Sequence, residues 1–257
     1  MSSLVLLTAQ IKKEFIYLRR YFFNFLGGFA TLYVVFLLIF LGYRGLAAGT
    51  DMYGTGLSNL IVGYMLWIFA MTIYQDISYH LFNEAREGIL EQLYMSPFGY
   101  IRVTALRLIA GLILNFGMAF VILLAMMLST GRFLNLDLIS LLPLILLLLL
   151  PIAGLGFILG GLQLIYKRIQ SILQIIQFLL VGVIAAPIHL GWTVLLPGSM
   201  ASHLVRQVMV EEVFLTALPL NQILIALLIA GVYLALGLFI FRLCERRAMI
   251  SGRLGQF

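Results

Sequence analysis

The sequence lacks most features that mark secreted, soluble or nucleotide-binding proteins. Its 257 residues include a single cysteine, Cys244, and only 10% of them are charged, against about 25% in an ordinary soluble domain. One cysteine excludes an internal disulfide and a multi-cysteine metal site. No G-x-x-x-x-G-K-[ST] phosphate loop occurs in the chain, so any ATP used with this protein is expected to bind another chain.

Apolar residues are what the chain has in abundance. They make up 63% of the sequence, the mean hydropathy is +1.11, and no polar region is long enough to form a soluble domain. This composition predicts an all-α polytopic membrane protein with one transmembrane domain over residues 1–257. The net charge of +6 does not indicate nucleic acid, because the basic residues form short clusters at the ends of apolar runs.

Six apolar runs are long enough to cross a bilayer as helices. These predicted spans cover residues 21–43, 57–79, 103–128, 138–166, 171–190 and 222–243. The first run is too long for the core of a secretory signal, and five more runs follow it. Pro143 and Pro151 are expected to kink the fourth span or delay its start, and Gly156 and Gly160 form a small-xxx-small pair suited to close helix packing.

Two further segments are expected at the membrane surface. In residues 1–20, apolar side chains recur every three or four positions with basic side chains on other faces, which predicts an amphipathic interfacial helix. The residues singled out in it are Lys12, Lys13, Phe15, Arg19 and Arg20. Residues 191–221 contain apolar pieces too short to cross a membrane, which predicts a broken re-entrant segment capped by a surface loop.

Residues 81–97, LFNEAREGILEQLYMSP, are the only long charged and amphipathic stretch. As a helix, its acidic face holds Glu84, Glu87 and Glu91, and its apolar face holds Ile89, Leu90, Leu93 and Tyr94. Pro97 ends the helix, and Gly88 in its middle indicates a bend or a close contact. Such a helix suits a soluble partner or the membrane surface; a solvated loop helix, paired with the chain's own arginines, is the alternative.

Charge predicts the orientation of the spans. An even number of spans places both termini on one side, and of the 16 Lys and Arg residues all but Arg44, Arg132 and Arg206 lie on that side. The positive-inside rule then makes both termini and the acidic helix cytoplasmic, in a cell membrane, with residues 191–221 outside.

In their order along the chain, these features resemble the ABC-2 type transporter permease family. EGILEQLYMSP is similar to the family's Glu-Gly, Leu-Glu-x-Leu and Ser-Pro pattern between the second and third spans. The outer piece with Pro197, and LPLNQ from Leu218 to Gln222, form a weaker match. The resemblance covers essentially the whole chain.

The resemblance implies the permease subunit of an ATP-driven exporter, with no catalytic residue, cofactor or metal of its own. Its partners would be soluble ABC ATPase subunits carrying ATP and Mg, a second permease copy in a homodimer or heterodimer, and membrane lipid, without nucleic acid. The segment 81–97 would be the coupling helix that docks on the ATPase. The residues assigned to that contact are Glu84, Glu87, Gly88, Ile89, Leu90, Glu91 and Leu93.

Polar residues in or near the spans are candidates for a translocation path. They are Thr72, Asp76, Asn115, Gln170, Gln174 and Gln177. Such residues rarely face lipid, but hydrogen bonding between helices explains amides at least as well, and we favour it. His189 and His203 have no ligand-like spacing for a metal.

A secondary transporter and an intramembrane enzyme are the two alternative classes of protein. A secondary transporter not coupled to ATP would usually show internal repeats with matched interrupted spans, and no convincing repeat is present. An intramembrane enzyme needs a positioned nucleophile, and neither Ser58 nor Ser171 lies in a Gly-x-Ser-x-Gly setting. The substrate does not follow from the sequence, and the outward direction of transport rests on the resemblance.

Overall fold

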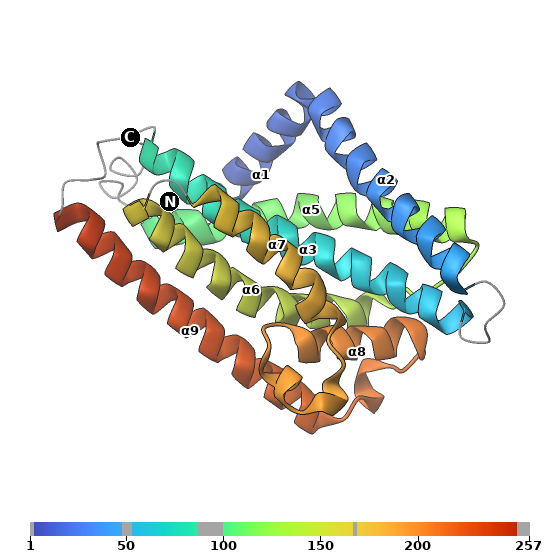
Figure 1. The fold of residues 1–257 in the computed structure, drawn as a ribbon. Coiled ribbons are helices and arrows are strands. Elements are labelled where there is room, and N and C mark those ends of the chain that lie inside the picture. Colours follow the sequence, from blue (N-terminus) through green and yellow to red (C-terminus); the bar gives the residue numbers. More distant parts are fainter. Residues whose placement is uncertain (1–2, 48–52, 87–99, 167–168, 251–257) are drawn as a thin grey trace.

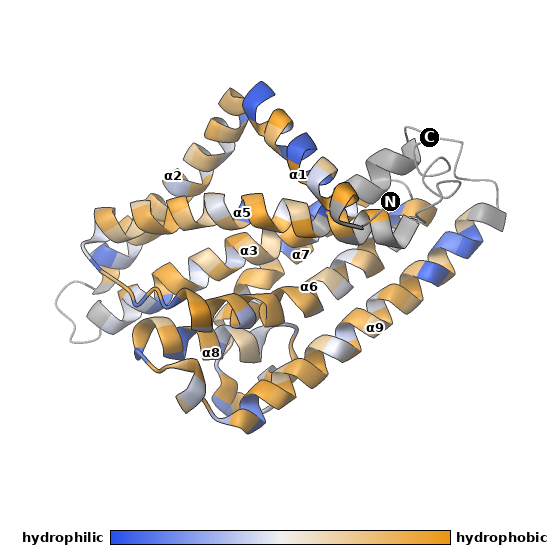
Figure 2. Ribbon diagram, turned by 180° about the vertical axis from the view of Figure 1, so that it is seen from behind, coloured by the Kyte–Doolittle hydropathy of each residue, from blue (hydrophilic) through white to orange (hydrophobic). Residues whose placement is uncertain are grey.

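The computed structural model describes residues 3–47, 53–86, 100–166 and 169–250, which form a bundle of eight α-helices (Figure 1). Within those ranges there is no β-strand. Five helices are long and apolar enough to cross a membrane, so the expectation of an all-helical membrane protein is confirmed. Hydrophobic residues cover most of the length of these helices, and hydrophilic residues lie mainly toward their ends (Figure 2).

The five long helices agree in position with five of the predicted spans. They are α2 (Phe22–Ala47), α3 (Tyr53–Arg86), α5 (Tyr100–Thr130), α6 (Leu138–Tyr166) and α9 (Leu220–Ile250). The helix α6 runs through both Pro143 and Pro151.

The span expected at residues 171–190 is shorter than predicted. Its helix, α7 (Gln170–Ala185), has 16 residues, fewer than the roughly 20 that a bilayer requires. It ends because Ala186 is extended, with ψ of 129°, as the ring of Pro187 demands of the residue before it. The prediction of six full-length spans is therefore not confirmed, because five of the predicted spans correspond to long helices and the one at residues 171–190 corresponds to a short helix.

The helix α3 forms the centre of the bundle. It contacts α2, α5, α6, α7 and α8. In its apolar, potentially membrane-spanning stretch, 61% of the residues are buried inside the protein, against 11% in the corresponding stretch of α2. Tyr74, Leu66 and Ile77 on α3 are among the most buried large side chains of the described chain. Any displacement of α3 would consequently be felt by most of the other helices.

The helices α6 and α9 pack backbone to backbone. A Cβ on Gly237 of α9 would lie 2.6 Å from the Cα of Gly154, and one on Gly161 would lie 3.1 Å from the Cβ of Cys244. Gly156, from the predicted small-xxx-small pair, instead faces α3, where Ile77 Cβ lies 3.2 Å from the position of its missing Cβ. Small residues thus bring α6 close to two neighbours on different faces.

The helix α1 (Ser3–Arg20) occupies the range predicted for the amphipathic helix and contacts α5. It runs across the long axis of the bundle and meets α2 at a sharp bend (Figure 1). Leu7, Ile11 and Leu18 are partly buried, whereas Phe15 is exposed. Lys12, Lys13, Arg19 and Arg20 are also exposed.

The chain from residue 186 to 219 is broken into short elements, as expected for this segment. They are η1 (Ile188–Leu190), η2 (Trp192–Leu195), α8 (Ser199–Val210) and η3 (Leu215–Ala217). Gly191 and Gly198 turn the chain with φ of 69° and 86°, values that glycine adopts without strain. The Oγ atom of Ser199 donates to Thr193 O at 2.5 Å, and Ser202 Oγ donates to Ile184 O at 2.8 Å. The bond from Ser202 satisfies a carbonyl that a longer α7 would have paired within the helix.

The two ends of the bundle differ in which helix termini lie there. The last turns of α3, α6 and α9 and the first turns of α5 and α7 lie at one end (Figure 1). The helix α8 and the last turn of α2 lie at the other. The acidic segment therefore joins α3 to α5 at the end opposite α8.

Candidate functional site

The described structure includes only the beginning of the predicted coupling helix. Residues 81–86 continue α3 without a break, so α3 extends beyond Tyr79, where the second span was expected to end. Glu84 lies on the last turns of this helix. The other assigned contact residues, Glu87, Gly88, Ile89, Leu90, Glu91 and Leu93, lie outside the described residues. The candidate docking segment thus starts as an extension of the central helix.

Asp76 of α3 faces α5, the helix on the other side of the acidic segment. Its Oδ2 atom is 3.2 Å from the position that a Cβ on Gly111 would take. Arg107, one turn earlier on α5, is 4% exposed. The side chain of Asp76 therefore packs between the two helices that flank the acidic segment, and a buried arginine lies one turn away on α5.

Gln177 joins α7 to α3 by hydrogen bonds. Gln75 Nε2 donates to Gln177 Oε1 at 2.9 Å, and Trp67 Nε1 donates to the backbone oxygen of Gln177 at 3.0 Å. Tyr74 adds a third bond between the same helices, from its hydroxyl to Leu173 O at 3.1 Å. This arrangement fits the interpretation that Gln177 forms hydrogen bonds between helices and does not line a translocation path.

The other candidate path residues lie on α3, α5 and α7, outside the two grooves described below. Thr72 Oγ1 donates to Phe69 O of its own helix at 2.9 Å, and Asn115 is partly buried on α5. Gln170 and Gln174 are exposed on α7. None of the six candidates lines either of the two grooves described next.

A groove of about 400 Å³ between α2, α3 and α7 was not expected from the sequence. Its described walls include Val35 of α2, Trp67 of α3 and Val181 of α7, and Arg206 of α8 contributes its only charged lining side chain. From the sequence, Arg206 was expected only as one of the few basic residues on the outer side. A signal was present nonetheless, because an arginine within an apolar segment is by default a functional candidate.

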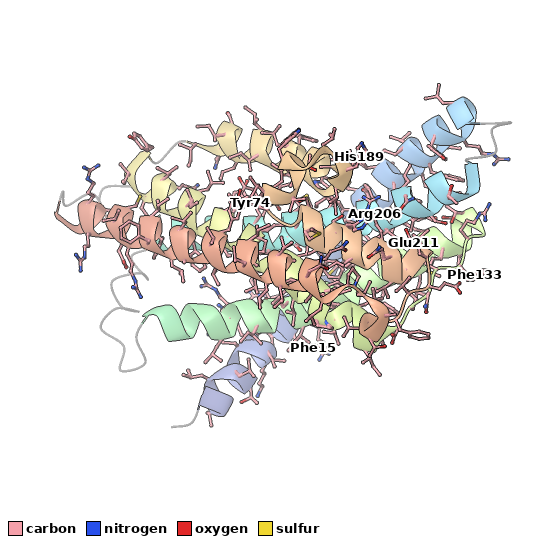
Figure 3. All side chains as sticks on the ribbon, turned by 90° about the horizontal axis from the view of Figure 1, so that it is seen from below. Phe15, Tyr74, Phe133, His189, Arg206 and Glu211 are labelled. Carbon is pink, nitrogen blue, oxygen red and sulfur yellow. The ribbon has the colours of Figure 1, made fainter. Side chains whose placement is uncertain are left out.

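Arg206 reaches from α8 to α3 and α7 (Figure 3). Its Nη1 donates to Asn59 O and its Nη2 to Ile184 O, both at 3.3 Å. Gly63 leaves room for the guanidinium, since a Cβ there would be 2.9 Å from Nη2. Burial lowers the pKa of Arg206, but a guanidinium starts so high that it stays charged.

His203 lies one turn earlier on α8. Burial lowers its pKa, and the nearby charge of Glu211 partly offsets that effect. The imidazole is therefore mainly neutral at pH 7 and leaves the guanidinium as the main charge near the groove.

A second groove, of about 460 Å³, lies where α1 and α2 diverge from α5. Phe22, Phe25, Ile113 and Val121 are among its lining residues, and every side chain described there is apolar. The groove therefore has no described polar side chain that could form a hydrogen bond or an ion pair with a ligand.

Metal-binding groups are absent from the described part of the chain, where no three His, Cys, Asp or Glu residues cluster. Cys244 is buried at the contact of α6 with α9. In comparisons with known proteins, no protein-family model matches the chain, and no curated protein is significantly similar to it.

Proposed function

We propose that the chain is the permease subunit of an ABC-2 type exporter in the cell membrane, driven by separate ATPase subunits that bind ATP and Mg. The observation that supports this most is the continuity of α3 from the core of the bundle into the acidic segment. A partner that binds this segment would act directly on the most buried of the five long apolar helices that the structure describes.

The dimensions of α3 suit this role. Its 34 residues span about 50 Å at 1.5 Å per residue, which exceeds a hydrocarbon core of about 30 Å. One end of α3 therefore projects beyond the bilayer, while its other half contacts α8. A displacement at Glu84 would move α3 as a rigid body and rearrange the packing at the far end.

The flanking elements support the same reading. The helix α5, which follows the acidic segment, contacts both α3 and α1. A partner docked on the acidic segment would therefore act on two helices that are packed against each other and against α1. The exposed apolar faces of α2, α7 and α9 are available for lipid and for a second permease copy, which would complete a path between the two copies.

The test is purification of the tagged full chain from its own host in mild detergent, with mass spectrometry of associated proteins. We expect a soluble ATPase with a phosphate-loop motif in comparable amount, and its loss when Glu84, Glu87 and Glu91 are all replaced by Lys. A chain that purifies alone and transports without ATP would contradict the proposal and favour a secondary transporter.

The proposed orientation predicts that the end of the bundle with α8 faces outward. Glu212 is exposed there and follows α8, so Glu212→Cys in intact cells should react with a membrane-impermeant maleimide. Gly198 is a poor labelling site because it is buried, with φ of 86°.

Two controls accompany this measurement. The unmodified chain should label weakly, because Cys244 is buried. A cysteine at Gly99 should react only after the cells are permeabilised. Labelling of residue 99 but not of residue 212 in intact cells would invert the orientation.

A further inference from the structure

The groove between α2, α3 and α7 opens on the apolar surface of the bundle. Val35, Ile39, Phe178 and Val181 line it and are each more than a third exposed. Its volume of about 400 Å³ is within the range of about 300–1,000 Å³ typical of small-ligand sites. In a bilayer this groove would meet lipid chains rather than water.

Arg206 places a positive charge beside these apolar walls. Its two described bonds are long and go to neutral carbonyls, and no carboxylate pairs with it in the described ranges of the chain. A guanidinium has five N–H donors, so donors remain for another acceptor. A partly buried charge without an opposite charge is costly, and this cost favours an anionic ligand.

We propose that the groove binds one hydrocarbon chain of an anionic phospholipid whose phosphate is held by Arg206. Arginine suits this role because its planar guanidinium can donate two parallel hydrogen bonds to phosphate oxygens. The groove follows α3 from Gly56 to Trp67, a rise of about 16 Å, which gives a hydrocarbon chain an extended apolar wall. The proposal is independent of coupling to an ATPase, because lipid binding is a property of this chain alone.

Trp67 offers a direct readout of this lipid. It lines the groove, its ring is held by the bond to Gln177 O, and only 8% of the residue is exposed. Bulk lipid has little access to it, so quenching by a brominated chain reports a lipid inside the groove. The protein has two tryptophans, so Trp192→Phe leaves Trp67 as the only source of tryptophan fluorescence.

The experiment uses the full chain with Trp192→Phe in phosphatidylcholine vesicles. Dibrominated phosphatidylglycerol or dibrominated phosphatidylcholine is added at increasing mole fraction. We expect the anionic lipid to half-quench Trp67 at about a tenfold lower fraction, because the choline ammonium of phosphatidylcholine offsets the negative charge of its phosphate and is repelled by Arg206. Arg206→Gln should abolish this preference, and Arg206→Lys should keep only part of it, because the positive charge remains but the two parallel hydrogen bonds of the guanidinium are lost.

A matched pair of valines tests the apolar part of the site. Val181 lines the groove and is 44% exposed, whereas Val232 on α9 does not line it and is 48% exposed. Val181→Phe should reduce quenching by both brominated lipids, and Val232→Phe should leave both unchanged. This pair keeps the proposal testable if Arg206→Gln fails to fold.

Three results of the lipid titrations would overturn the proposal: equal quenching by the two lipids, an unchanged preference in Arg206→Gln, or unchanged quenching in Val181→Phe. Inorganic phosphate added to the vesicles separates a lipid site from a free-anion site. We expect no effect of phosphate. Loss of the lipid preference in phosphate would assign Arg206 to a soluble anion and contradict the proposal.

Discussion

Replacing Gly237 by Ala should destabilise the folded protein by about 3 kcal/mol, the upper end of the usual cost of overpacking. The added methyl group would overlap the carbonyl oxygen of Gly154 and lie 2.6 Å from its Cα. Both are backbone atoms of α6, which cannot rotate away as a side chain can. The two helices would have to separate along their whole contact.

The reaction rate of Cys244 with a maleimide during heating in detergent measures this separation. Cys244 is buried in the same contact, so it should react at a clearly lower temperature in the variant. Gly231→Ala is the matched control on α9, because nothing described lies within 4 Å of its missing Cβ. Alanine there should be neutral or stabilising by up to about 1 kcal/mol from helix propensity. Equal behaviour of the two variants would refute the close contact.

Replacing Glu87 by Lys should leave folding and membrane insertion intact and weaken coupling to the proposed ATPase partner by about tenfold or more. Reversing a charge at a docked interface replaces attraction by repulsion, and losing one partner of a buried charge pair costs about 2–5 kcal/mol. Glu87 directly follows the last described residue of α3, so we expect it to lie where a partner would bind. The measurement is ATP hydrolysis by the purified complex, together with the amount of ATPase retained.

Glu212→Lys is the control, since it makes the same charge reversal after α8, at the other end of the bundle. It should leave hydrolysis and assembly unchanged. If Glu87→Lys also leaves both unchanged, Glu87 has no part in the mechanism. If both variants lose activity, the effect is one of net charge rather than of docking.

Much of the fold could be read from the chain because local rules set it. Apolar length predicted the helix at residues 138–166 with the bounds that α6 has. Spacing predicted the helix that occupies residues 3–20, and short apolar pieces with glycine and proline predicted the broken segment around Gly191 and Gly198. The early end of α7 was also readable, because Pro187 excludes a helical residue before it.

Prediction of the site was less complete for a specific reason. Asp76 and Gln177 stand out as polar residues in apolar runs, and only their neighbours distinguish a path from a helix contact. Gln75 and Trp67 bond to Gln177, and Gly111 places Asp76 against α5. Arg206 was assigned to orientation alone because its neighbours, Asn59 and Ile184, come from distant parts of the chain.

The sequence by itself determined the class of protein, the positions of the five long apolar helices and the uneven distribution of basic residues along the chain. Only the tertiary structure decided that α3 is central and α2 peripheral, that Gly154 meets Gly237, and that Arg206 borders an apolar groove. The physical reason is that lipid chains and protein side chains are equally apolar. A helix in a membrane therefore carries no hydrophobic pattern that separates its packed face from its lipid face, and shape complementarity makes that choice.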